Sequence, residues 1–124
     1  MNQNILAPMN MTDSIYQFPL IDKRFVDNVV EGFQGWNGKK VPEGWHNYMC
    51  AGAGGMWSTP TDIAKFALNM TDSYLGHNKG LLIKKISHHA LTRQPNTDFG
   101  LGMVISGADK ELYFWKGGHN YGYV

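Results

Sequence analysis

The chain has 124 residues, of which 43% are hydrophobic and 17% are charged, and its 11 basic and 10 acidic residues give a net charge of +1. This length allows one domain or part of one. The balanced charge excludes the strongly basic face that binds nucleic acids or anionic membranes. The single Cys50 excludes an internal disulfide, and we expect its side chain to be a small buried apolar group.

Neither a membrane span nor an export signal is visible in the sequence. No apolar run approaches the length that crosses a membrane. The first ten residues lack the basic region and the long apolar stretch of a signal peptide. The compartment of the protein therefore stays open, and we expect no membrane span and no nucleic acid among the partners of this chain.

The first half of the chain has one short helical stretch and then a long irregular segment. Residues 4–9 read as the end of a helix that Pro8 stops, and Asn10 suits the left-handed conformation that follows a helix. Residues 11–48 show little periodicity and are predicted to form a long loop. A loop of that length is usually functional or disordered, and the tryptophans Trp36 and Trp45 argue against disorder.

The clearest local pattern is "STPTDIAKFALNM", residues 58–70. Thr59 as N-cap, Pro60 at the first helical position and Asp62 at the third are typical of a helix start. Ile63, Phe66, Ala67 and Met70 then recur at helical spacing and form one apolar stripe. The pattern predicts an amphipathic helix.

The last third of the chain changes from helical to strand periodicity. A second helix is predicted over residues 83–93, with Ile83, Ile86, Ala90 and Leu91 on one side. The stretches 99–106 and 111–118, "FGLGMVIS" and "ELYFWKGG", are separated by a Gly-bearing turn and predict an antiparallel hairpin. A turn at 120–122 would lead into a third strand that begins with Tyr123 and Val124.

Four segments together carry a resemblance to a known family. They are "ILAPMNMTDS", "AGGMWSTPTDIAKF", "DFGLGMVIS" and "FWKGGHNYGY". In this order they resemble the "PLGM", "GG-(L/M)-x-ST", "YGLGF" and K-T-G or H-x-G segments of the serine β-lactamase and penicillin-binding-protein superfamily, and of class C β-lactamase-related hydrolases most closely. The resemblance implies an α+β fold, in which an antiparallel sheet is combined with helices of an inserted helical subdomain. Residues 1–124 would form a single incomplete domain of that fold, lacking its N-terminal part and its C-terminal strands and helix.

Two of the three catalytic elements of this family are absent from the sequence. The family attacks a carbonyl with the serine of an S-x-x-K element, assisted by Y-x-N or S-x-N and by K-T-G. No serine of the chain is followed by lysine three positions later, and no tyrosine or serine has asparagine two positions later. We therefore expect the chain by itself to be inactive.

The third element is represented by Lys116, Gly117 and Gly118. The resemblance implies that Lys116 faces the nucleophile and stabilises negative charge, that Gly118 lets the strand approach the substrate, and that the backbone N–H of His119 is an oxyanion-hole donor. Gly117 replaces a hydroxyl residue that usually helps to hold a substrate carboxylate. This replacement weakens the case for β-lactam or D-Ala-D-Ala substrates. Without the resemblance, Lys116 would be interpreted as a solvated lysine at a sheet edge.

Further candidate substrate-binding residues lie in the long loop and near the end of the chain: Trp45, His46, Asn47 and Tyr121. The loop residues could line a cleft or belong to a packed surface loop. His77, His88 and His89 are interpreted as solvated residues, because no carboxylate or cysteine joins them at metal-ligand spacing. Neither a metal nor an organic cofactor is expected.

The sequence thus predicts a fragment of a β-lactamase-related serine hydrolase, whose full-length parent would hydrolyse an ester, an amide, or a β-lactam or D-Ala peptide through an acyl-enzyme. The alternative is a non-catalytic ligand- or partner-binding module derived from the same fold. A small molecule or a peptide would be the substrate of the parent. An unpaired strand edge in the hairpin could also bring two copies of the chain together.

Overall fold

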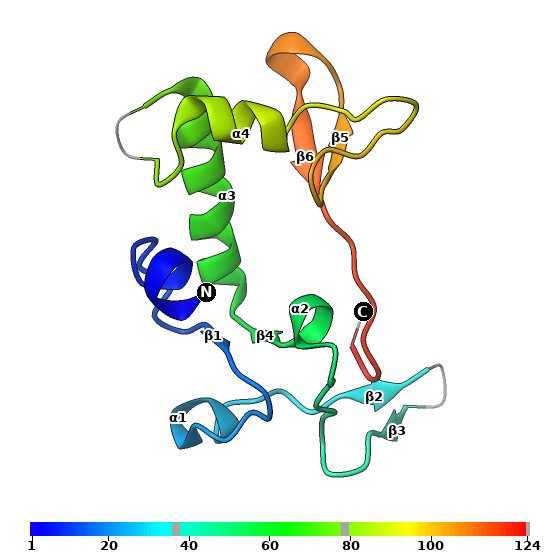
Figure 1. Cartoon of the computed structure of the whole chain (residues 1–124). Coiled ribbons are helices and arrows are strands. Elements are labelled where there is room, and N and C mark those ends of the chain that lie inside the picture. The colour runs from blue at the N-terminus through cyan, green and yellow to red at the C-terminus, as the bar shows by residue number, and fades with distance from the viewer. Residues whose placement is uncertain (36–37, 78–79, 124) are drawn as a thin grey trace. The chain divides into compact units, whose positions relative to one another are not determined.

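The computed structural model describes residues 1–35, 38–77 and 80–123 (Figure 1). The helical elements are η1 (Asn2–Leu6, a π-helical turn), α1 (Lys23–Val26), α2 (Ala51–Gly54), α3 (Pro60–Leu75), α4 (Lys84–Ala90) and η2 (Asp109–Glu111, a 3₁₀ turn). The strands are β1 (Ile15–Tyr16), β2 (Phe33–Gln34), β3 (Lys39–Lys40), β4 (Met56–Trp57), β5 (Val104–Ser106) and β6 (Tyr113–Trp115). Helices and small antiparallel sheets occur together, which confirms the predicted α+β class.

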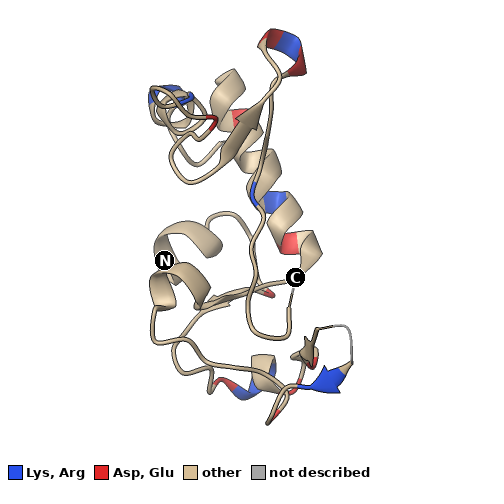
Figure 2. Ribbon diagram, turned by 90° about the vertical axis from the view of Figure 1, so that its right-hand side faces the viewer, with Lys and Arg blue, Asp and Glu red and all other residues tan. Residues whose placement is uncertain are grey.

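The chain divides into two compact units. The first contains residues 1–63 and the segment from Gly118 onward, and the second contains residues 64–117. The long helix α3 begins in the first unit and continues in the second. Lys and Arg lie on separate elements of both units, with Asp and Glu among them (Figure 2).

Short elements and a small apolar core hold the first unit together. As predicted, Asn10 adopts a left-handed conformation with φ of 54° after the N-terminal helical turn. The segment 11–48 is mostly irregular, also as predicted, although it contains β1, α1 and the β2–β3 hairpin. Its buried apolar side chains include Met11, Leu20 and Val41. Cys50 is exposed, so the prediction that it is buried was wrong.

The structure confirms the helix predicted from residue 59 onward and extends it to Leu75. The Thr59 hydroxyl accepts a hydrogen bond from the Asp62 backbone N–H at 3.3 Å, which is the N-cap bond that the sequence pattern predicts. In the apolar stripe Met70 is buried and Phe66 is half-buried, whereas Ile63 is 43% exposed. The burial of the stripe therefore increases along α3 from its N-terminal end, in the first unit, to Met70, in the second.

The second unit has its core where α3, α4 and the hairpin meet. Met70, Leu91 and Ile105 are buried together, and Phe66 and Phe114 pack against them. The second helix is shorter than predicted, since α4 ends at Ala90 instead of Arg93. The apolar face predicted for this helix was also partly wrong. Ile83 and Ile86 are exposed, and Ser87 is buried instead. Ser87 is accommodated because its hydroxyl donates to the Lys84 carbonyl at 2.9 Å.

The predicted hairpin is present but its first strand is shorter than expected. Val104, Ile105 and Ser106 of β5 pair with Trp115, Phe114 and Tyr113 of β6. Residues 99–103, which were predicted as strand, form a turn closed by the Phe99–Val104 bridge. Two glycines explain the turn. Gly102 has φ of +93°, and a Cβ on Gly100 would lie 2.2 Å from the Ala90 carbonyl oxygen.

The segment after β6 leaves the sheet. β6 ends at Trp115, so Lys116 lies one residue beyond the strand on which the sequence placed it. Asn120 and Tyr123 form a bridge across a turn, as predicted for 120–122, while Val124 lies outside the described residues. Among the described residues β5 and β6 form a two-stranded sheet. Association of two copies through its edges stays a prediction.

Candidate functional site

A network of buried polar groups joins two of the segments that carry the sequence resemblance. Asp62 is fully buried, and its Oδ2 accepts hydrogen bonds from the Asp13 backbone N–H at 2.8 Å and from the Ser14 hydroxyl at 2.7 Å. Ser14 Oγ lies 2.7 Å from Ser58 Oγ. Because Ser14 gives its one proton to Asp62, Ser58 donates this second bond. The network fixes residues 13–14 against the start of α3, beside the β1–β4 pair.

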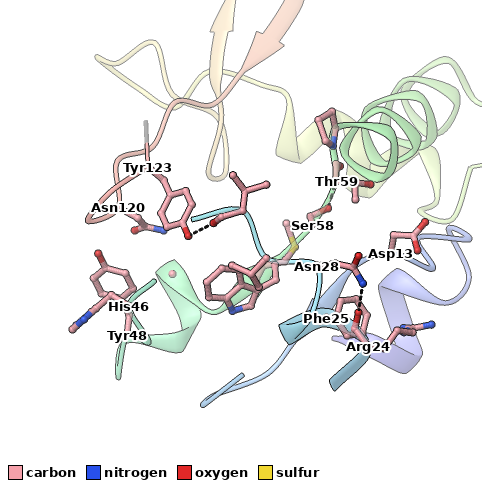
Figure 3. A pocket seen from close by; sticks show the side chains of 16 residues that line it. Asp13, Arg24, Phe25, Asn28, His46, Tyr48, Ser58, Thr59, Asn120 and Tyr123 are labelled. Carbon is pink, nitrogen blue, oxygen red and sulfur yellow. Dashed lines mark hydrogen bonds between the residues drawn. The ribbon is translucent and has the colours of Figure 1, made fainter. Parts of the chain in front are cut away.

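A cleft of about 660 Å³ lies in the first unit (Figure 3). Its lining residues are Asp13, Arg24, Phe25, Asn28, Val29, Val30, His46, Tyr48, Gly54, Met56, Trp57, Ser58, Thr59, Pro60, Asn120 and Tyr123. All of them belong to the first unit. The volume is within the usual range of small-molecule sites, which are mostly apolar with a few placed polar groups. The cleft is therefore the best-formed candidate site of the described residues.

Aromatic side chains form one part of the cleft wall. The Trp57 ring meets the Tyr123 ring edge-to-face, with centroids 6.4 Å apart. On the other side Trp57 meets Trp45 at the same centroid distance. The His46 ring lies 5.0 Å from that of Tyr48. Such edge-to-face pairs stabilise each other and give a firm apolar wall.

Close backbone packing sets the position of Tyr123. The Phe33 backbone N–H donates to the Gly122 carbonyl at 3.0 Å, and the Tyr123 hydroxyl donates to the Val30 carbonyl at 2.5 Å. Burial of the phenol raises the pKa of Tyr123 above its ordinary value, and the negative charge of Glu31 adds to the effect. The phenol is thus held in its neutral, hydrogen-bonding form.

We expect this phenol to make stability depend on pH in the alkaline range. A raised pKa means that the folded state holds the Tyr123 proton more tightly than the unfolded state. Its contribution is therefore complete below the ordinary value of 10.0 and is lost as pH rises through the folded value. In an absorbance titration of tyrosinate, Tyr123→Phe should remove an ionisation that lies above the ordinary value of 10.0. The exposed Tyr113→Phe is the control, and an unchanged high-pH part of the titration in Tyr123→Phe would contradict the assignment.

Three of the residues predicted to bind substrate, Trp45, His46 and Tyr121, lie in or next to the cleft. His46 lines it, Trp45 packs against Trp57, and the Tyr121 ring lies 6.1 Å from that of His46. Asn47 Oδ1 accepts a hydrogen bond from the Leu20 backbone N–H at 2.9 Å and so holds the loop. Trp36 lies outside the described residues.

The residues predicted to be catalytic, Lys116, Gly118 and His119, are divided between the two units. Lys116 ends the second unit together with Gly117, which was predicted to bind substrate, while Gly118 and His119 belong to the first. All four are exposed, and Lys116 Nζ donates to the Gly117 carbonyl. A Cβ on Gly118 would meet no atom within 4 Å. The protein itself therefore leaves room at Gly118, where the sequence predicts close approach of a substrate.

Sequence reasoning missed several residues of the cleft, including Arg24, Phe25, Asn28 and Tyr123. The first three come from α1 and the residues after it, and a four-residue helix is too short to show helical periodicity. Its one local signal is Asp22, whose side chain accepts from the Arg24 backbone N–H and caps the helix.

The serine that borders the cleft is not activated as a nucleophile. Among the described residues, Ser58 Oγ donates its one proton to the Ser14 hydroxyl at 2.7 Å, and the Thr59 carbonyl oxygen lies 3.3 Å away. Neither group is a general base of the kind that a nucleophilic serine needs. The Ser58–Ser14–Asp62 network therefore ties segments together and does not prepare an attack.

No metal centre is found in the part of the chain that the structure describes, where no group of three or more His, Cys, Asp or Glu side chains is suitably placed. The prediction that His88 is solvated was wrong, since its ring stacks on Tyr74 at 4.1 Å and its Nε2 lies 2.9 Å from the Tyr74 carbonyl oxygen. Among the described helices, none combines the length and the apolar character needed to cross a membrane. A comparison with protein-family models finds no match, and neither does a comparison with curated protein sequences.

Proposed function

We propose that the chain is part of a serine hydrolase related to the class C β-lactamases, and that it contributes the K-T-G-type wall of the active site. One observation carries the proposal: the four segments of the resemblance meet in pairs. Residues 5–14 and 53–66 are joined by the hydrogen bonds of Asp62, and residues 98–106 and 114–123 are joined in the β5–β6 hairpin. Segments that contact each other in one fold are expected to do so in a related one.

In this proposal the chain supplies charge and shape, and the nucleophile comes from outside these 124 residues. Lys116 stabilises the negative charge that develops on the attacked carbonyl, and the His119 N–H is the second oxyanion-hole donor. Gly118 gives the substrate access to the backbone. The reaction is acyl transfer to a serine, followed by hydrolysis of an ester, an amide, or a β-lactam or D-Ala peptide.

The test uses the protein expressed from the whole reading frame that encodes this chain. We expect that frame to contain an S-x-x-K element and a Y-x-N or S-x-N element on the N-terminal side. With a p-nitrophenyl ester and a chromogenic β-lactam as substrates, Lys116→Ala should lower kcat/KM about 100-fold. Lys110→Ala, an exposed lysine in η2, should leave kcat/KM unchanged. Turnover that survives Lys116→Ala would overturn the proposal.

A second function is favoured by the cleft itself. All residues that line it belong to the first unit, so a ligand would need neither Lys116 nor an added nucleophile in order to bind. The chain would then be a non-catalytic binding module derived from the hydrolase fold. Ligand binding without any covalent serine adduct would distinguish this function from the first.

A further inference from the structure

We infer that the cleft of the first unit binds a small ligand with a flat aromatic body and one carboxylate, and that Arg24 receives the carboxylate. The inference goes beyond the hydrolase proposal and does not rest on it, because it uses no residue to which that proposal gives a catalytic role. It follows from three features: the stacking of Arg24 on Phe25 without a carboxylate partner, the aromatic wall, and the charges of the residues that line the cleft.

Arg24 is held in a position that suits an incoming carboxylate. Its guanidinium carbon lies 4.3 Å from the centroid of the Phe25 ring. Stacking on a ring fixes the plane of the guanidinium and leaves its N–H edge free to donate two parallel hydrogen bonds. In residues 1–35, 38–77 and 80–123, the ion pairs found involve other cations: Lys23, Lys40, His77 and Arg93. Within the described chain, the Arg24 side chain thus has no carboxylate partner.

The remainder of the cleft suits a flat apolar body. Figure 3 shows Arg24, Phe25 and Asn28 toward one end of the cleft, and Tyr48 and Tyr123 toward the other. Trp57 also lines the cleft. Rings of a ligand bind to such a wall by stacking and edge-to-face contacts. A carboxylate at the Arg24 end would leave the aromatic body against this wall.

The charges along the wall favour an anion with a single charge. Arg24 is the one lysine or arginine among the residues that line the cleft, and Asp13 is the one acidic residue. A cationic ligand group at the Arg24 end would be repelled by the guanidinium, and a second carboxylate would find no other lysine or arginine among the described lining residues. The ligand is therefore a monocarboxylate, with Asn28 as an additional hydrogen-bonding group at the same end.

Three probes with one aromatic body test this inference by isothermal titration calorimetry: 2-naphthoate, 2-naphthamide and 2-naphthylmethylamine. We expect 2-naphthoate to bind at least tenfold more tightly than the neutral amide, because hydrogen bonds to charged groups contribute more than neutral ones, and the amine to bind more weakly still. Arg24→Gln should remove the advantage of 2-naphthoate and leave the affinity for 2-naphthamide unchanged.

Lys23→Gln is the matched control. Lys23 neighbours Arg24 on α1 and pairs with Asp27, but it does not line the cleft. This variant should keep the preference for 2-naphthoate. Equal affinity for the three probes, equal effects of the two variants, or no binding of 2-naphthoate would each overturn the inference. Hydrolysis plays no part in the measurement, so its outcome is independent of the hydrolase proposal.

Discussion

Asp62→Ala is expected to lower the free energy of unfolding by about 4 kcal/mol, since it leaves two hydrogen-bond donors without their acceptor at about 1–3 kcal/mol each. The donors are the Asp13 backbone N–H and the Ser14 hydroxyl, which converge on Asp62 Oδ2. The side chain is fully buried, so water does not replace the lost acceptor at the same site. Urea unfolding followed by circular dichroism measures the change.

Asp27→Ala is the control for Asp62→Ala. The Asp27 carboxylate is 55% exposed and pairs with Lys23 one helical turn away. An exposed pair of this kind contributes about 0.5 kcal/mol. If both variants changed stability by the same small amount, Asp62 would not be the residue that ties residues 13–14 to α3.

Gly122→Ala is expected to lower the free energy of unfolding by about 3 kcal/mol. Gly122 has φ of +88°, a conformation that costs other residues about 1–2 kcal/mol. An added Cβ would also lie 2.4 Å from Val41 Cγ2 and 3.0 Å from the Gly32 Cα, and overpacking of this kind costs about 1–3 kcal/mol. The same displacement should move Tyr123 and change the cleft.

Gly118→Ala is the matched control for Gly122→Ala, because a Cβ at that position meets no atom within 4 Å. We expect its stability to stay within about 1 kcal/mol of the wild-type protein. A similar loss of stability in both variants, measured by thermal unfolding, would contradict the packing described for Gly122.

The predictions from sequence succeeded where the cause is local. The N-cap Thr59 and the following Pro60 act within one helical turn, so the start of α3 is visible in the sequence. Asn10 takes its left-handed conformation for an equally local reason. The β5–β6 hairpin also follows from two apolar stretches around a turn.

The predictions failed where contacts between residues distant in sequence determine the local structure or bring a site together. Alternation of apolar residues predicted strand over 99–103, but the backbone of Gly100 packs against the carbonyl of Ala90 and the chain turns there. The cleft could not be predicted as a whole, because its residues come from separate stretches between Asp13 and Tyr123. His46 was considered as a cleft residue from the sequence, because it lies in a loop with aromatic residues. Arg24 gave no comparable signal, because α1 is too short to show helical periodicity.

The most direct test of the hydrolase proposal is the site of covalent labelling. The protein from the whole reading frame is treated with a fluorophosphonate probe, and peptide mass spectrometry locates the modified residue. We predict one adduct, on the serine of an S-x-x-K element outside these 124 residues. An adduct on Ser58 or another serine of this chain, or no adduct at all, would contradict the proposal.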